Sequence, residues 1–298
     1  MNEITRRQAL VSLATITAGA VLKTRNVFSA EPVKTQIRFP VIGDWGTGNS
    51  DQIGIAKKMF EAHQQAPFDF VIAAGDNIYP NGSGRYFDKH FERPFAPLLA
   101  ERINFYAVLG NHDVREGRQD QCQYPLFNMG GRNYFSLKQG DGLLEMFMLD
   151  STDCDATQLG WLEQELKSST AHWKMAVFHH PIYSSGKRHG SDVELREKLE
   201  PLFVRYGVNA AFSGHDHIYE RTKPQQGIHY FVTGAGGQTR HGIDYNSPFH
   251  AKGYDKDNHF MLIEADHSQI GFQAISKTGG VIDQGVINHT DSKIALSK

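Results

Sequence analysis

Residues 70–79 read Phe-Val-Ile-Ala-Ala-Gly-Asp-Asn-Ile-Tyr, an unbroken apolar run that ends in a glycine and a carboxylate. A short apolar run bounded by turn residues is typical of a strand that is buried on both faces. Similar runs predict strands at residues 37–42, 105–109, 146–149, 175–178, 210–212, 230–232, 260–264 and 270–274. Helical patterns lie between the earlier strands, so the chain is predicted to adopt an α/β fold with largely buried sheets.

Two helices can be predicted from side-chain spacing. Ser191-Asp192-Val193-Glu194 has the form of a capping box, which satisfies free backbone amides at the start of a helix. The apolar stripe that follows it consists of Leu195, Leu199, Leu202 and Phe203. A second stripe at helical spacing consists of Leu159, Leu162 and Leu166.

Five polar clusters come directly after predicted strands. They are Gly43-Asp44-Trp45-Gly46, Gly75-Asp76-Asn77-Ile78-Tyr79, Gly110-Asn111-His112-Asp113, His179-His180-Pro181 and Gly214-His215-Asp216-His217. One such cluster would be an ordinary turn, but α/β proteins place their sites at the carboxyl ends of strands. Five clusters in five such positions therefore predict one shared site.

The side chains of these clusters suit metal ions. They offer carboxylates, an amide, a phenol and imidazoles, from Asp44, Asp76, Asn111, Tyr79, His179, His215 and His217. This set is too large for one tetrahedral zinc ion, and it suits a pair of ions that share a carboxylate. Because none of these side chains is a thiolate, iron and manganese are plausible metal ions beside zinc.

The composition excludes several classes of protein. The chain has 298 residues, of which 40% are hydrophobic and 21% charged, so intrinsic disorder is excluded. A net charge of −2 gives no electrostatic signature for binding nucleic acid. Two cysteines exclude a disulfide-rich scaffold, whereas 15 histidines leave imidazole as an abundant metal ligand.

The first thirty residues differ from the rest of the chain. The pair Arg6-Arg7 precedes an apolar run from Ala9 to Leu22, which is shorter than the roughly 20 residues that a membrane span needs. The segment resembles a twin-arginine export signal, and the alternative is an ordinary amphipathic helix. Cleavage after Ala20 or after Ala30 is compatible with the sequence. No linker or repeat divides the remainder, so we predict a signal peptide at 1–30 and one domain at 31–298.

The order of the five clusters resembles the calcineurin-like metallophosphoesterases. Tyr79, three residues after Asp76, makes the chain similar to the purple acid phosphatases, and its compact length is most similar to the tartrate-resistant type. The resemblance spans nearly all of residues 31–298. It implies a four-layer αββα sandwich, in which two mixed β-sheets are flanked by helices and a dimetal site lies at the carboxyl ends of the strands.

The resemblance also assigns ligands to two metal ions. The first, Fe(III), would be bound by Asp44, Asp76, Tyr79 and His217. The second, Fe(II), Zn or Mn, would be bound by Asn111, His179 and His215, with Asp76 bridging the two ions. His179 is favoured over its neighbour His180 because of its position relative to Pro181.

The implied activity is hydrolysis of phosphate monoesters by an acid phosphatase. A metal-bound hydroxide would attack phosphorus while His112, as general acid, protonates the leaving oxygen. His189 would line the substrate pocket, and Asp113 would orient His112 or a ligand. Phosphodiesterase or nucleotidase activity on the same dimetal core is one alternative, and a non-catalytic protein that binds metal and phosphate is another.

Other expectations concern partners and the remaining motifs. We expect a monomeric periplasmic or secreted protein without a stable membrane anchor, which binds a small phosphorylated substrate and inorganic phosphate, binds no nucleic acid, and uses the twin-arginine export machinery. Cys122 and Cys154 form either a disulfide or two buried thiols. The glycine-rich residues 234–237 lack the Lys-Ser/Thr pair of a P-loop and are predicted to form a turn at the rim of the site. Loops 115–128 and 239–257 would supply pocket walls.

Overall fold

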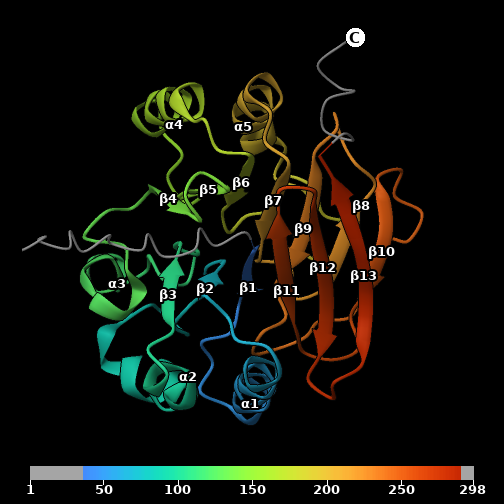
Figure 1. Ribbon diagram of the computed structural model, residues 1–298. Helices are drawn as coiled ribbons and strands as arrows, with labels where there is room; N and C mark the ends of the chain where they lie inside the picture. The colour runs from blue at the N-terminus through green and yellow to red at the C-terminus, as the bar shows by residue number, and fades with distance from the viewer. Residues whose placement is uncertain (1–35, 290–298) are drawn as a thin grey trace, which may run out of the picture. The chain divides into compact units, whose positions relative to one another are not determined.

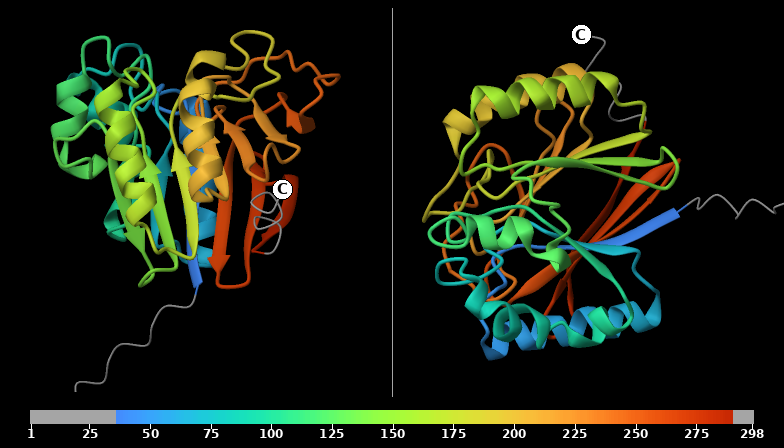
Figure 2. Two further views of the ribbon diagram at one scale, coloured as in Figure 1. Left: turned by 90° about the horizontal axis from the view of Figure 1, so that it is seen from above. Right: turned by 90° about the vertical axis from the view of Figure 1, so that its left-hand side faces the viewer.

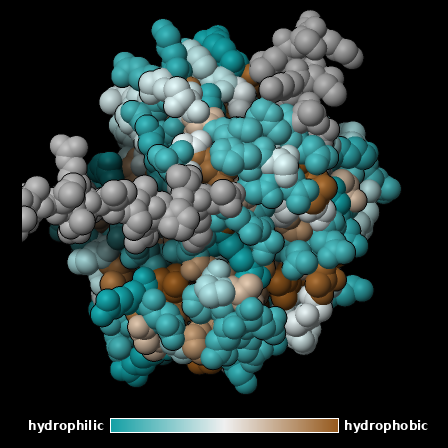
Figure 3. All heavy atoms as spheres, in the orientation of Figure 1, coloured by the Kyte–Doolittle hydropathy of each residue, from teal (hydrophilic) through white to brown (hydrophobic). Residues whose placement is uncertain are grey.

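The computed structural model describes residues 36–289, which form two β-sheets packed face to face with helices on their outer faces (Figures 1 and 2). The predicted signal at 1–30 lies outside these residues. Among residues 36–289, no helix is both long and apolar enough to cross a membrane. The face in Figure 3 is mostly hydrophilic, with hydrophobic residues in small separate patches.

The first sheet has six strands in the order β13-β12-β11-β1-β2-β3. Its strands are β1 (Gln36–Ile42), β2 (Phe70–Ala73), β3 (Asn104–Ala107), β11 (His259–Asp266), β12 (Gln269–Ser276) and β13 (Val281–Asn288). β1, β2 and β3 are parallel, whereas β11, β12 and β13 pair antiparallel, so the sheet is mixed. The parallel half carries the first three polar clusters at one end.

The second sheet has seven strands in the order β10-β8-β9-β7-β6-β5-β4. Its strands are β4 (Phe135–Gln139), β5 (Leu144–Met148), β6 (Trp173–Val177), β7 (Ala210–Ser213), β8 (Tyr219–Thr222), β9 (His229–Thr233) and β10 (His250–Tyr254). The four central strands, β5, β6, β7 and β9, are parallel. The last two polar clusters follow β6 and β7.

Helices cover the outer face of each sheet, as Figure 2 shows in its right-hand view. The helices are α1 (Ser50–Gln65), α2 (Ala96–Ala100), α3 (Arg118–Gln123), α4 (Ala156–Ser168) and α5 (Val193–Tyr206). Leu162, Leu166, Leu195, Leu199 and Phe203 of α4 and α5 are buried in one hydrophobic cluster with residues of the seven-stranded sheet. The predicted apolar stripes are therefore the faces by which α4 and α5 pack against this sheet.

The structure differs from the sequence predictions at several points. β4, β8, β10 and β13 were not predicted. The cap of α5 is Asp192, whose carboxylate accepts a hydrogen bond from the backbone of Leu195, because the Ser191 hydroxyl is bound to the backbone of Ser184 instead. Cys122 and Cys154 are both free thiols, so the disulfide alternative is wrong for this structure.

Candidate metal centre

The two sheets bring all seven predicted metal ligands to one end of the sandwich. Asp44, Asp76 and Asn111 follow β1, β2 and β3 of the six-stranded sheet by two to four residues. His179 and the pair His215 and His217 follow β6 and β7 of the other sheet. Because these strands are parallel within each sheet, their carboxyl ends meet at a common edge.

Tyr79 joins the two carboxylates on one side of this site. Its hydroxyl lies 2.9 Å from Asp76 Oδ2 and 3.2 Å from Asp44 Oδ1. His217 Nε2 lies 3.3 Å from both the Tyr79 hydroxyl and Asp44 Oδ1. Four oxygen and nitrogen atoms thus converge at the positions predicted for the first ion.

Asn111 joins two imidazoles on the other side of the site. Its side-chain oxygen lies 3.1 Å from His179 Nε2 and 2.9 Å from His215 Nδ1. His179 Nε2 is also 3.5 Å from Asp76 Oδ1, so Asp76 lies between the two groups. The other ring nitrogen of His179 lies 2.9 Å from the Ala74 carbonyl, which fixes the ring with Nε2 facing the site.

The backbone adopts an unusual conformation at three of these residues. Asp44, Asp76 and His215 have φ angles of 56°, 51° and 70°, in the left-handed region that non-glycine residues rarely occupy. The neighbouring chain is close enough that a Cβ on Gly214 would lie 2.3 Å from Asp44 Oδ2. Sharp turns and close approach of the backbone together place the three side chains in one volume.

The electrostatics of the site favour bound cations. Asp44 and Asp76 are almost fully buried, and in residues 36–289 neither has a Lys or Arg within 4.0 Å. Burial raises the pKa of both carboxyls, and the negative charge of Asp76 raises that of Asp44 further. Two buried carboxylates without a cationic side chain are costly, and bound metal ions would compensate their charge.

The imidazoles are held in the form that binds metal. Burial lowers the pKa of His179 and His215 far below the usual value, and that of His217 to about 4. Neutral imidazole is the ligand form of histidine. The donor set therefore fits a pair of ions, and three of its members, Asp44, Asp76 and His179, present ligand atoms within 4.8 Å of one another.

Comparison with known proteins identifies the family. The model of the calcineurin-like phosphoesterases matches residues 37–219. The chain belongs to this family. Purple acid phosphatase 17 of Arabidopsis thaliana is 33% identical over 278 residues, which cover 80% of this chain and 81% of the relative. Human tartrate-resistant acid phosphatase type 5 is 28% identical and covers 70% and 75% of the two chains.

Within the calcineurin-like phosphoesterases, the chain thus belongs to the purple acid phosphatases, as the sequence predicted, and it is similar to the tartrate-resistant type. The predicted enzyme class, a metal-dependent phosphoric monoester hydrolase, is confirmed at the level of the family, and so is a dinuclear metal centre. The individual ligands stay predictions that the geometry accommodates.

Solved structures confirm the predicted sandwich. GAP50, described as the anchor in the inner membrane complex of Plasmodium, has a TM-score of 0.76 at 20% identity and covers 89% of this phosphoesterase and 96% of its own chain. The purple acid phosphatase PPD1 of yellow lupin seeds has a TM-score of 0.74 at 20% identity and covers 87% and 55% of the two chains. At these identities the likeness shows the fold alone.

The two predicted catalytic histidines lie beside the centre of the phosphoesterase. The ring of His112 lies 4.6 Å from that of Tyr79, and the ring of His189 lies 4.0 Å from that of His215, between centroids. His180 is also close, with its ring 4.5 Å from that of His215, but its Nδ1 lies 2.9 Å from the Ser151 hydroxyl. His179 is therefore the better placed of the two neighbours to act as a ligand.

Asp113 was expected to orient His112 or a ligand, and its contacts favour the second of these roles. Its buried carboxylate accepts hydrogen bonds from the backbone amides of Asn77, Ile78 and Gly110, at 2.9–3.0 Å. Its side chain thus ties the loop after β2 to the loop after β3. The residue supports the positions of two predicted ligands through the backbone.

Sequence reasoning missed several residues around the centre. Arg240 donates a hydrogen bond from Nε to His217 Nδ1 at 3.1 Å. Burial and the charges of Asp44 and Asp76 raise the pKa of Tyr79, and a hydrogen bond from Gln238 acts in the opposite direction. Arg115 lies 3.2 Å from His112 Nε2. Arg115 and Arg240 belong to the loops that were expected to form pocket walls, but no motif marked them. The glycine-rich turn is where it was predicted, because Gly237 donates to the carbonyl of Asp44.

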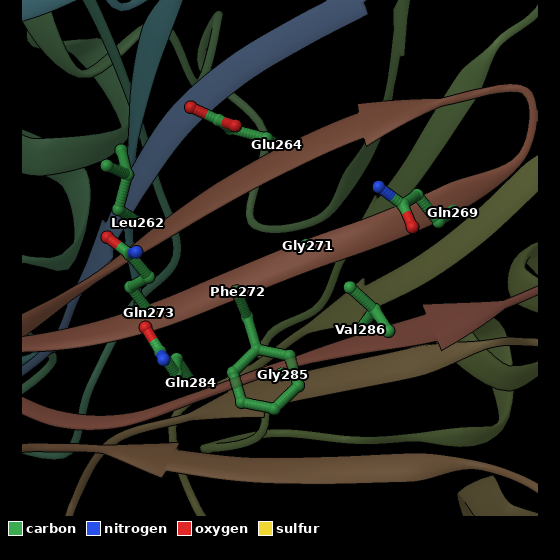
Figure 4. Close-up of a pocket in the computed structure, with 9 residues that line it drawn as sticks. All are labelled: Leu262, Glu264, Gln269, Gly271, Phe272, Gln273, Gln284, Gly285 and Val286. Atoms are coloured by element: carbon green, nitrogen blue, oxygen red, sulfur yellow. The ribbon is translucent and has the colours of Figure 1, made fainter.

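A separate hollow lies on the exposed face of the six-stranded sheet. It has a volume of about 490 Å³ and lies over β11, β12 and β13 (Figure 4). Phe272, Val286 and polar side chains such as Gln273 and Gln284 line it, and none of the predicted ligands does. The chemistry of this phosphoesterase is therefore assigned to the cluster at the strand ends.

Proposed function

We propose that the protein is an acid phosphatase that hydrolyses phosphate monoesters at a dinuclear metal centre. One observation carries the proposal: two buried carboxylates, joined by a tyrosine hydroxyl, face three imidazoles whose low pKa keeps them neutral. Such a site has too much uncompensated negative charge for a purely structural role.

We assign the first position to Fe(III), held by Asp44, Asp76, Tyr79 and His217. The second position, for Fe(II), Zn or Mn, belongs to Asn111, His179 and His215, with Asp76 shared. When bound, the two ions would lower the pKa of water and neutralise negative charge on the phosphoryl group.

The protein's own contribution is to hold the phosphate ester and move one proton. His112 lies beside Tyr79 and is partly exposed, and its Nδ1 lies 2.8 Å from the Pro80 carbonyl. We assign to it the transfer of a proton to the leaving oxygen, which is the task of a general acid. His189, on the opposite side beside His215, is assigned to binding the phosphate.

We also propose a route of export and a location. Arg6-Arg7 and the apolar run after it support recognition by the twin-arginine machinery and release into the periplasm or medium. Export after folding would allow iron to be loaded in the cytoplasm. We propose a monomer that binds a small phosphorylated substrate, releases inorganic phosphate, and binds neither nucleic acid nor membrane stably.

The test uses protein purified from its native host, with metal analysis and a visible spectrum. We expect two metal ions per chain, one of them iron, and hydrolysis of p-nitrophenyl phosphate that exceeds hydrolysis of bis-p-nitrophenyl phosphate. Asn111→Ala should lose one ion and most of the activity. Asn246→Ala, in an exposed turn, is the matched control. Full activity of the Asn111 variant, or faster cleavage of the diester, would contradict the proposal.

A further inference from the structure

Positive charge gathers at the mouth of the candidate centre without carboxylate partners. Arg115 lies beside His112, Arg188 precedes His189 in the chain, and Arg240 contacts His217. In the part of the chain from 36 to 289, none of these three arginines has a carboxylate oxygen within 4.0 Å. Of the nine other arginines in residues 36–289, six form ion pairs, namely Arg38, Arg85, Arg93, Arg118, Arg205 and Arg221. What sets the three apart is therefore that they lie together beside the candidate centre.

Arg115 is the arginine closest to the proposed proton donor. Its Nη2 lies 3.2 Å from His112 Nε2, and its Nη1 donates to the Pro80 carbonyl at 3.4 Å. A guanidinium has five N–H donors in a planar fork that fits carboxylate and phosphate groups. The side chain of Arg115 is exposed, so most of its donors face solvent at the mouth.

The backbone that carries Arg115 is fixed by close packing. Glu116 donates its backbone N–H to the Asn81 carbonyl at 3.0 Å, and Gly117 donates to the Asp113 carbonyl at 3.2 Å. A Cβ on Gly117 would lie 1.8 Å from the Gly82 carbonyl oxygen, so only glycine allows this approach. The turn that holds Arg115 is therefore set before any substrate binds, which lowers the entropic cost of binding.

The position of Arg115 selects the part of the substrate that it can touch. In hydrolysis, a water oxygen bonds to phosphorus and gives up a proton to solvent, while the bond from phosphorus to the ester oxygen breaks. The ester oxygen keeps the electron pair and takes up a proton. His112 Nε2 accepts from Arg115 in this structure, so it carries a proton only when Arg115 has turned to another acceptor. If His112 supplies the proton, the departing alcohol lies next to His112, and an anionic group on that alcohol is the acceptor within reach of Arg115. Arg115 then faces the leaving group, whereas the metal ligands face the phosphoryl group.

We infer that Arg115 is a specificity-determining residue that binds a second anionic group on the leaving alcohol of the substrate. The preferred class is phosphate monoesters whose alcohol carries a carboxylate or a further phosphate. This inference rests on the proposed phosphatase function. Arg188 precedes His189, and its positive charge acts on His189 and His217, so we expect it to add general positive charge to the mouth without contacting the leaving group.

The test compares two substrates that differ only in charge, 3-carboxyphenyl phosphate and 3-carbamoylphenyl phosphate, with metal-loaded full-length protein. We expect the carboxylate substrate to have the higher kcat/KM, and Arg115→Gln to lower the ratio of the two kcat/KM values about tenfold, as for loss of one charge-assisted contact. Arg115→Lys should restore part of the ratio. Calorimetry with the non-hydrolysable 3-carboxybenzyl and 3-carbamoylbenzyl phosphonates should show the same preference in Kd.

Two control variants separate a specific contact from bulk charge. Arg205→Gln removes an exposed arginine that pairs with Glu163 on the helical face, and Arg188→Gln removes one from the mouth. An unchanged ratio in Arg115→Gln, or an equal fall in Arg188→Gln, would overturn the inference while leaving the phosphatase function intact. Failure of the wild-type protein to hydrolyse either ester would instead contradict the proposed function.

Discussion

The carboxylate of Asp113 offers a sharp test of how the site is built. It accepts five hydrogen bonds, from the backbone amides of Asn77, Ile78 and Gly110 and from the side chains of Asn77 and Gln121. Asn in its place keeps one acceptor oxygen and replaces the other with an amide that cannot accept. At least one buried backbone N–H, that of Ile78 if the remaining oxygen faces Asn77 and Gly110, then has no partner.

The expected cost follows from the number of donors left without an acceptor. One buried unsatisfied N–H costs about 1–3 kcal/mol, so Asp113→Asn should lower the free energy of unfolding by about 2 kcal/mol. Asp113→Ala leaves three such amides and should cost about three times as much. Asp120→Asn is the control, because the exposed carboxylate of Asp120 accepts one backbone hydrogen bond, from Gly84 at 2.9 Å.

Urea denaturation of the metal-loaded protein measures these differences. The metal-loaded protein is used because burial and the charge of Asp76 raise the pKa of Asp113. Bound cations would reduce the repulsion between these two carboxylates. The same variant should bind metal about 10–100-fold more weakly, since Asp113 fixes the loops that carry Asp76 and Asn111. An Asp113→Asn protein as stable as Asp120→Asn, with unchanged metal affinity, would refute the reasoning.

Two other perturbations test separate parts of the structure. Tyr79→Phe removes the hydroxyl that contacts both carboxylates, so the iron-loaded variant should lose its visible absorption while its far-ultraviolet circular dichroism stays the same; a surviving band would remove Tyr79 from the iron site. His259 is fully buried, and burial lowers its pKa from 6.5 to about 3, so its contribution to stability is complete above pH 6.5 and is lost as the pH falls toward 3. Between pH 6.5 and 4, the free energy of unfolding should therefore fall less steeply in His259→Gln than in the wild type, with a difference in slope of up to about 1.4 kcal/mol per pH unit. Equal slopes would contradict this assignment.

The sequence predicted the strands that contain a short apolar run and missed those that lack one, including β8, which is largely buried but contains Glu220 and Arg221. β2 and β7 are continuous apolar runs, which leave little choice of structure. β10 contains Lys252 and Gly253 and has no fully buried residue. β13 lies at the edge of its sheet, and Ile287 is its one buried residue. Such strands are defined by pairing with β8 and β12, which is information from distant parts of the chain.

The same distinction holds at the candidate centre. The predicted ligands follow buried strands directly, so their place could be predicted from local patterns. Arg115 and Arg240 lie within loops, and their contacts with His112 and His217 depend on how those loops fold back over the strand ends. The sequence could not decide whether Asp113 orients His112 or a ligand, because its partners include backbone amides 35 and 36 residues away.

The left-handed backbone at Asp44, Asp76 and His215 lowers the stability of the fold at the positions where the predicted metal ligands are needed. Glycine would be easier to accommodate at each of these positions, and asparagine in place of either aspartate would remove their mutual repulsion when no cation is present. A thermostability screen carried out in the presence of a chelator would therefore reward Asp44→Asn and Asp76→Asn. Directed evolution of this chain toward higher thermostability would therefore need metal in the medium at every round. Without metal, it would select for a stable protein that has lost its metal ligands and its activity.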